Sequence, residues 1–195
     1  MERGDHRTAP VRVEVLVVGA CAATVYYRRV CATLARDTHP DVAAAQAVQL
    51  VGSSVSARPV AVSAGQGGVQ RDGPQPDWAP PPLTMLHSTS WRFDEGAVVL
   101  TYVAVLDGVP GADSVLLVSR DVARSGDPAV PSPPEITLYA VAAHALRHLA
   151  WLRERDEVVA TALASAPFVW DALDGVEPSP AGAVTAARRV TAVVR

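Results

Sequence analysis

Apolar residues recur at helical spacing over the longest regular stretch of the chain, residues 134–155 (PEITLYAVAAHALRHLAWLRER). At about 100° per residue they form one stripe, and two prolines and a glutamate suit the start of a helix. The sequence therefore predicts a long amphipathic helix with His144, His148 and Trp151 on its polar side. The expected core stripe consists of Leu138, Val141, Ala142, Ala145, Leu149 and Leu152.

Two stretches with strand-like patterns, residues 83–93 and 97–106, predict a β-hairpin joined by the turn 94–96. Residues 97–106 are nearly all apolar, which indicates a central strand. Strict alternation in the first strand would place His87, Thr89, Trp91 and Phe93 on one face, and Leu86, Ser88, Ser90 and Arg92 on the other.

The N-terminal half gives less regular patterns. Residues 11–19 read as a buried strand, and residues 22–36 are expected to form a helix. Asp41 can cap a short alanine-rich helix that ends at Leu50. Residues 55–63 suggest an edge strand, because they contain a proline, and residues 65–82 form a loop rich in glycine and proline.

These elements predict an α+β fold: a mixed, mostly antiparallel sheet with flanking helices, across which helix 134–155 packs. The strands between 83 and 119 form its centre, and 11–19 joins them. We expect one domain over residues 1–195, with a flexible loop at 65–82, because a chain of this length typically forms one core. Shorter helices are expected at 156–164 and 167–173, and a last one near the C-terminus.

Composition narrows the class of partner. All 17 basic residues are arginine, which indicates a GC-rich bacterial genome, and the net charge is −3. That charge balance argues against nucleic-acid binding, and no apolar run approaches a membrane span. Cys21 and Cys31 form no CxxC motif, so reduced thiols and a cytoplasmic location are expected. A small molecule or a protein is the expected partner, and the sequence leaves a homodimer open.

The candidate chemistry centres on the histidines. His144 and His148 are four residues apart, a spacing at which two imidazoles can share a metal ion, and His87 could join them. The glutamate of an HExxH motif is absent, and Arg147 brings positive charge, so no metal is assigned. The alternative is that the histidine pair packs against Trp151 or caps polar groups. The expected ligand-binding set is His87, Trp91, Arg92, His144, His148 and Trp151.

Other signals are weaker. Cys21 would be an activated thiol if it lay where a strand ends and a helix begins, although most free cysteines are simply buried. Gly19 alone does not make a dinucleotide-binding G-x-G-x-x-G motif, so the cofactor stays unknown.

The hairpin LHSTSWRFDEGAVVLTYVAVL resembles the central hairpin of Nudix-type domains, over about residues 83–120. The resemblance implies a mixed sheet with flanking helices. The family's hallmark, G-x5-E-x7-R-E-U-x-E-E-x-G-U, is absent, and the nearest acidic stretch, residues 153–157, lacks its glycine and paired glutamates. No residue of the family's site is therefore carried over to this chain.

Two functions remain open from the sequence. The first is a non-catalytic domain that binds a small ligand or another protein. The second is a hydrolase-type enzyme with a histidine-lined, metal-dependent or metal-free site formed by His87, His144 and His148. An enzyme should bring His87, Cys21 or an acid within hydrogen-bond reach of the histidine pair.

Overall fold

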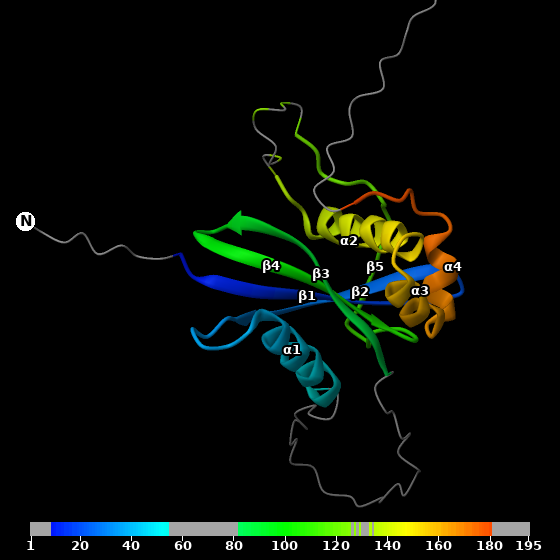
Figure 1. Ribbon diagram of the computed structural model, residues 1–195, viewed down its shortest axis with the longest axis horizontal. Coiled ribbons are helices and arrows are strands. Elements are labelled where there is room, and N and C mark those ends of the chain that lie inside the picture. Colours follow the sequence, from blue (N-terminus) through cyan, green and yellow to red (C-terminus); the bar gives the residue numbers. More distant parts are fainter. Residues whose placement is uncertain are drawn as a thin grey trace, which may run out of the picture.

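The computed structural model describes residues 9–54, 82–125, 127, 129, 133 and 135–180. A mixed five-stranded sheet runs in the order β3-β4-β1-β2-β5, with α1 on one face and α2, α3 and α4 on the other (Figure 1). The predicted α+β class is confirmed. The strands are β1 (Val11–Cys21), β2 (Thr24–Thr33), β3 (Leu83–Asp94), β4 (Ala97–Leu106) and β5 (Val115–Leu116).

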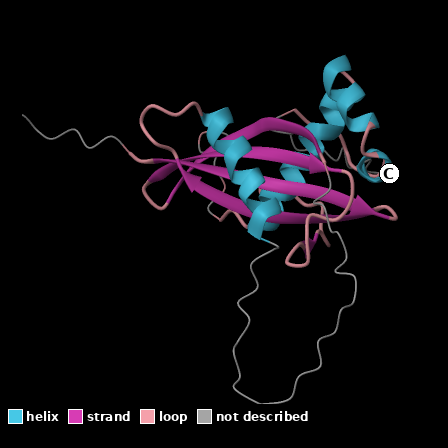
Figure 2. Ribbon diagram, turned by 90° about the horizontal axis from the view of Figure 1, so that it is seen from below, coloured by secondary structure: helices cyan, strands magenta, loops and turns pink. Residues whose placement is uncertain are grey.

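The central strand β1 pairs in parallel with β4 and antiparallel with β2. Its run of valines and leucines is buried on both faces, as a continuous apolar strand predicts. Alternate residues supply two cores. One core includes Leu16 and Val103 beneath α2 (Leu138–Arg153), α3 (Glu157–Ala164) and α4 (Pro167–Leu173). The other packs against α1 (Pro40–Ser54), which crosses the opposite face of the sheet (Figure 2).

The predicted helix at residues 22–36 is wrong, because this segment contains the whole of β2. A two-residue turn, Ala22-Ala23, joins Cys21 to its paired residue Thr24. Both alanines have positive φ, 47° and 60°, as a type I′ hairpin turn requires. The usual Asn-Gly signal for that turn is missing from the sequence, and the apolar residues of β2 also fit a helical stripe.

The hairpin of β3 and β4 is confirmed, with Glu95-Gly96 as its turn. The predicted faces of β3 are only half right, since the pairing shifts register between Ser88 and Ser90. Thr89 lies in this bulge, where its buried hydroxyl donates to the Thr101 carbonyl at 3.2 Å. The extra residue exchanges the two faces of the strand from this point onward.

Helix α2 confirms the predicted amphipathic helix but starts at Leu138, four residues later than 134, after the capping side chain of Thr137. The predicted core stripe is buried except at Leu138, which is partly buried. The polar side, however, is not a solvent face: His148 is 8% exposed. Helices α3 and α4 lie beside it on the same face of the sheet, and they contact both α2 and the strands, so α2 is covered on its sheet side and along one flank.

The helices predicted at 156–164 and 167–173 are confirmed as α3 and α4. Strand β5 has two residues and pairs with β2, at the opposite edge of the sheet from β3. The expected strand at 55–63, the loop at 65–81 and the C-terminal helix lie outside the described residues. Within the residues that are described, no helix has the length and apolar character needed to cross a membrane.

Candidate functional site: a cleft between β3 and α2

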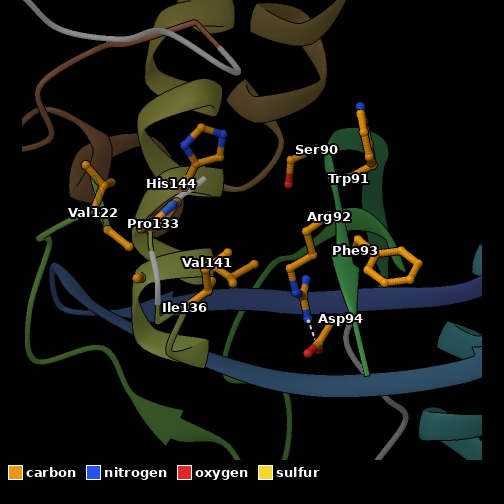
Figure 3. Close-up of a pocket in the computed structure, with 12 residues that line it drawn as sticks. Ser90, Trp91, Arg92, Phe93, Asp94, Val122, Pro133, Ile136, Val141 and His144 are labelled. Atoms are coloured by element: carbon orange, nitrogen blue, oxygen red, sulfur yellow. Dashed lines mark ion pairs between the residues drawn. The ribbon is translucent and has the colours of Figure 1, made fainter. Parts of the chain in front are cut away.

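A cleft of about 680 Å³ lies between the C-terminal half of β3 and the N-terminal half of α2. The chain that precedes α2 forms its third side (Figure 3). Most of the lining from α2 and this preceding chain is apolar, whereas β3 supplies polar groups. The lining residues are Ser90, Trp91, Arg92, Phe93, Asp94, Val122, Ala123, Pro133, Ile136, Ala140, Val141 and His144.

The bulge at Thr89 decides which β3 side chains face this cleft. Ser90 and Arg92 point from the strand toward α2, and Trp91 and Phe93 point away from it (Figure 3). The two aromatic side chains are 70% and 65% exposed on the other face of the sheet. Trp91 therefore belongs to the rim of the cleft and does not present its ring to the interior.

Arg92 is held by a carboxylate in the sheet. Its two terminal nitrogens contact the two oxygens of Glu14 at 2.7 and 3.0 Å, and it also donates to the Thr101 hydroxyl at 3.1 Å. Glu14 is fully buried, and the Arg29 side chain reaches the same carboxylate at 2.9 Å. The Asp94 carboxylate lies 3.6 Å from Nη2 of Arg92, the nitrogen that also contacts Glu14 Oε2 (Figure 3).

The charges in this network support one another. Burial by itself raises the pKa of Glu14, but the hydrogen bond and charge of Arg92, with the charge of Arg29, outweigh it and lower the pKa overall. The hydrogen bond to Glu14 in turn raises the pKa of Arg92. Glu14 and Arg92 are therefore both charged near neutral pH and form a fixed, bidentate pair.

Three histidines gather where α2 approaches β3. The rings of His87 and His148 lie 5.6 Å apart, and Trp151 stacks on His148 at 5.9 Å between centroids. Burial, followed by the nearby charges of His87 and His144, lowers the pKa of His148 to about 4. Burial also lowers the pKa of His87 and of His144. All three imidazoles are thus neutral at pH 7.

His144 is the histidine that lines the cleft. It is half-buried, and its Nε2 atom has no hydrogen-bond partner among the described residues. A buried polar atom without a partner costs stability, and a bound ligand could supply the missing contact. The ring projects from α2 into the space between the helix and β3 (Figure 3).

The structure thus divides the six predicted ligand-binding residues. Arg92 and His144 share the cleft, whereas His87, His148 and Trp151 form the adjacent stack and Trp91 faces outward. Sequence reasoning missed Glu14, although a lone acid within an apolar strand is a recognisable signal of a buried pair. It also missed the cleft roles of Ser90 and Asp94, because it did not foresee the bulge.

Neither the metal hypothesis nor the thiol hypothesis gains support. Among the described residues, no group of three or more His, Cys, Asp and Glu side chains is arranged to hold a metal ion. Cys21 is exposed and precedes a β-turn, so the helix N-terminus on which an activated thiol depended does not exist.

Comparison with known proteins gives one weak relationship. No family model matches the chain, and no curated protein matches it. Among solved structures, the chain is similar to a candidate nudix hydrolase family member from Chromobacterium violaceum, with a TM-score of 0.42 and 11% sequence identity over 87% of this chain and 98% of the other. The weak Nudix-like resemblance predicted from the hairpin is confirmed at that level, and it assigns no activity to this chain.

Proposed function

We propose that this protein binds a small molecule in the cleft between β3 and α2 without transforming it. The observation that carries the proposal is the cleft itself, whose volume of about 680 Å³ suits a small ligand. Apolar side chains from α2 and the preceding chain would contact the body of the ligand. Ser90, Arg92 and His144 would fix its orientation through hydrogen bonds.

The rigidity of Arg92 supports binding. A guanidinium already held by both oxygens of Glu14 and by Thr101 does not need to be ordered when a ligand arrives. Preorganised contacts raise affinity because less side-chain entropy is lost on association. The cleft wall formed by β3 is therefore suited to recognition.

The polar groups of the cleft do not form a catalytic set. Nucleophilic or acid-base catalysis needs a base that an adjacent group orients toward a nucleophile or a proton. No hydrogen bond joins His144 to a serine, cysteine or acid among the described residues, and Asp94 is paired with Arg92. These contacts favour binding over hydrolysis.

A hydrolase is the second candidate, and one observation favours it. His87 lies against His148, and both imidazoles are neutral near pH 7, the form in which histidine accepts a proton. Hydrolysis of p-nitrophenyl acetate by the protein, lost in His148→Ala and retained in His39→Ala, would place the enzyme hypothesis first. His39 is exposed and lies just before α1, on the other side of the sheet.

The proposed binding is tested by filling the cleft. A fragment library is screened by thermal shift, and the hits are repeated with Ala140→Phe, which puts a ring into the cleft. Ala164→Phe, at the exposed end of α3, is the matched control. Hits that fail with Ala140→Phe and persist with Ala164→Phe support the cleft, whereas hits that survive both substitutions contradict it.

A further inference from the structure

We infer that the ligand of this cleft is uncharged, with an apolar body and a group that both donates and accepts hydrogen bonds. The inference rests on the proposed binding function and adds the chemical class of the ligand. It follows from the way in which every charge near the β3 wall is already neutralised by a neighbour.

Arg92 in the β3 wall, Arg12 of β1 and Arg29 of β2 each have an acidic partner. Arg92 contacts Glu14 and Asp94, Arg29 contacts Glu14, and Arg12 lies 3.4 Å from Glu95. The charges of these three guanidinium groups and three carboxylates therefore sum to zero. Among the described residues Arg92 is the one cation that lines the cleft, and its charge is not available to an anion without competition from two carboxylates.

None of the described residues that α2 and the chain before it contribute to the lining carries a charge near neutral pH. His144 is the one titratable side chain that α2 contributes to the lining, and its lowered pKa follows from burial and from Arg147. Its neighbours Ala140 and Val141 are apolar, and so are Val122, Ala123, Pro133 and Ile136. A charged ligand would lose part of its hydration here and would meet no countercharge among these lining residues, which is unfavourable.

The cleft, in contrast, offers both hydrogen-bond donors and hydrogen-bond acceptors. The Ser90 hydroxyl can donate and accept, and a neutral His144 ring has one donor and one acceptor nitrogen. The Nε2 atom of His144 lacks a partner among the described residues. A carboxamide, a lactam or a neutral nitrogen heterocycle on an apolar body matches these groups. An anion or a cation matches them less well.

The test uses three probes that share one ring system: 2-naphthamide, 2-naphthoate and 2-naphthylmethylammonium. Dissociation constants are measured at pH 7.5 by two-dimensional NMR, from the backbone amide shifts of Ser90, Val141 and His144. We expect the neutral amide to bind about tenfold more tightly than either ion. The Ala140→Phe protein should lose the binding of the amide, and the Ala164→Phe protein should keep it.

Asp94→Asn tests the charge argument directly, because it removes one of the two carboxylates that face Arg92. The ratio of naphthoate to naphthamide affinity should rise several-fold in this variant. Asp113→Asn is the matched control: it causes the same change in net charge beside Arg28, at 3.1 Å, outside the cleft lining. That control should leave the ratio unchanged.

The outcomes separate this inference from the proposed function. If naphthoate or the ammonium probe binds as tightly as the amide or more tightly, the inference is wrong and the binding function stands. An unchanged ratio in Asp94→Asn also overturns it. If none of the three probes shifts the amides of the cleft, both the inference and the proposed function are wrong.

Discussion

The Arg92 guanidinium meets the Glu14 carboxylate through two contacts, at 2.7 and 3.0 Å, although the residues are 78 positions apart in the chain. They belong to different strands, β3 and β1, separated by β4. Thr101 of β4 lies between them and donates to the same carboxylate at 3.2 Å. One buried pair thus connects the wall of the cleft to the centre of the sheet.

Truncation of Arg92 should therefore destabilise the fold strongly. Arg92→Ala leaves Glu14 fully buried with only Arg29 and Thr101 as partners, and an incompletely paired buried charge costs about 3 kcal/mol. The free energy of unfolding is measured in urea at pH 7. Arg12→Ala, which removes a pair with the exposed Glu95 and a hydrogen bond to the Asp94 carbonyl at 2.8 Å, should cost less, about 1 kcal/mol.

The double variant Glu14→Leu/Arg92→Met shows whether the unpaired charge of Glu14 or the lost packing of Arg92 causes the destabilisation. Since both charges are removed together, its stability should lie well above that of Arg92→Ala. Equal losses for the single and double variants would show that packing by the Arg92 side chain, and not the buried charge, explains the effect.

Stability should fall as the pH is lowered from about 6.5 to 4. His148 has a pKa of about 4 in the folded protein, against 6.5 for an unperturbed histidine, so the unfolded chain binds more protons over this range. His87 and His144 have lowered pKa values too and act in the same direction. Where His148 is protonated in the unfolded chain but not in the folded protein, it contributes about 1.4 kcal/mol of stability per pH unit. Above about pH 6.5 its contribution no longer changes with pH.

His148→Phe should flatten this part of the stability profile, measured by urea unfolding at half-unit steps of pH. His39→Phe should not, because His39 is exposed. Glu14 acts in a lower window: its pKa is lowered, so its contribution is present above about 4.5 and is lost as the pH falls through the folded value. A profile for His148→Phe that matches the parent protein between pH 4 and 6.5 would contradict the role of this ring.

The sequence alone predicted the elements whose hydrophobic periodicity is long and regular. Helix α2 and the β3–β4 hairpin were predicted because their patterns extend over many residues. The helix predicted at 22–36 failed because β2 is partly exposed on both sides, which blurs its alternation. The cleft could not be foreseen, since one inserted residue at Thr89 exchanges the faces of β3 and leaves no trace in the alternation.

Buried polar groups were harder to interpret than apolar ones. His148 reads as a surface residue when α2 is considered alone, but it is buried in the fold, where its ring lies against His87 of β3 and stacks with Trp151. Glu14 reads as an interruption of an apolar strand, while its partners Arg29, Arg92 and Thr101 come from three other strands. Which of these segments, far apart in the sequence, pair with one another depends on the tertiary structure.

Gly19 should be irreplaceable in β1. A Cβ atom at this position would lie 1.7 Å from the carbonyl oxygen of Gly108, and backbone cannot move away cheaply. Gly19→Ala is therefore expected to cost at least about 3 kcal/mol in urea unfolding. Gly175→Ala is the control: its Cβ would meet the end of the flexible Arg120 side chain at 2.5 Å, so a loss below about 1 kcal/mol is expected.

The turn between β1 and β2 should be improvable. Ala22 and Ala23 occupy positive φ, a region that costs an ordinary residue about 1 kcal/mol and that asparagine and glycine tolerate. Ala22→Asn/Ala23→Gly should raise the free energy of unfolding by about 1 kcal/mol, since the entropy cost of glycine offsets part of the gain. The β3–β4 turn already carries glycine at its second position, Gly96 with φ of 77°, so Glu95→Asn should change stability less. A loss of stability in the Asn-Gly variant would mean that the alanine methyl groups make contacts that outweigh the backbone strain, and that the hairpin is held by packing and not by its turn.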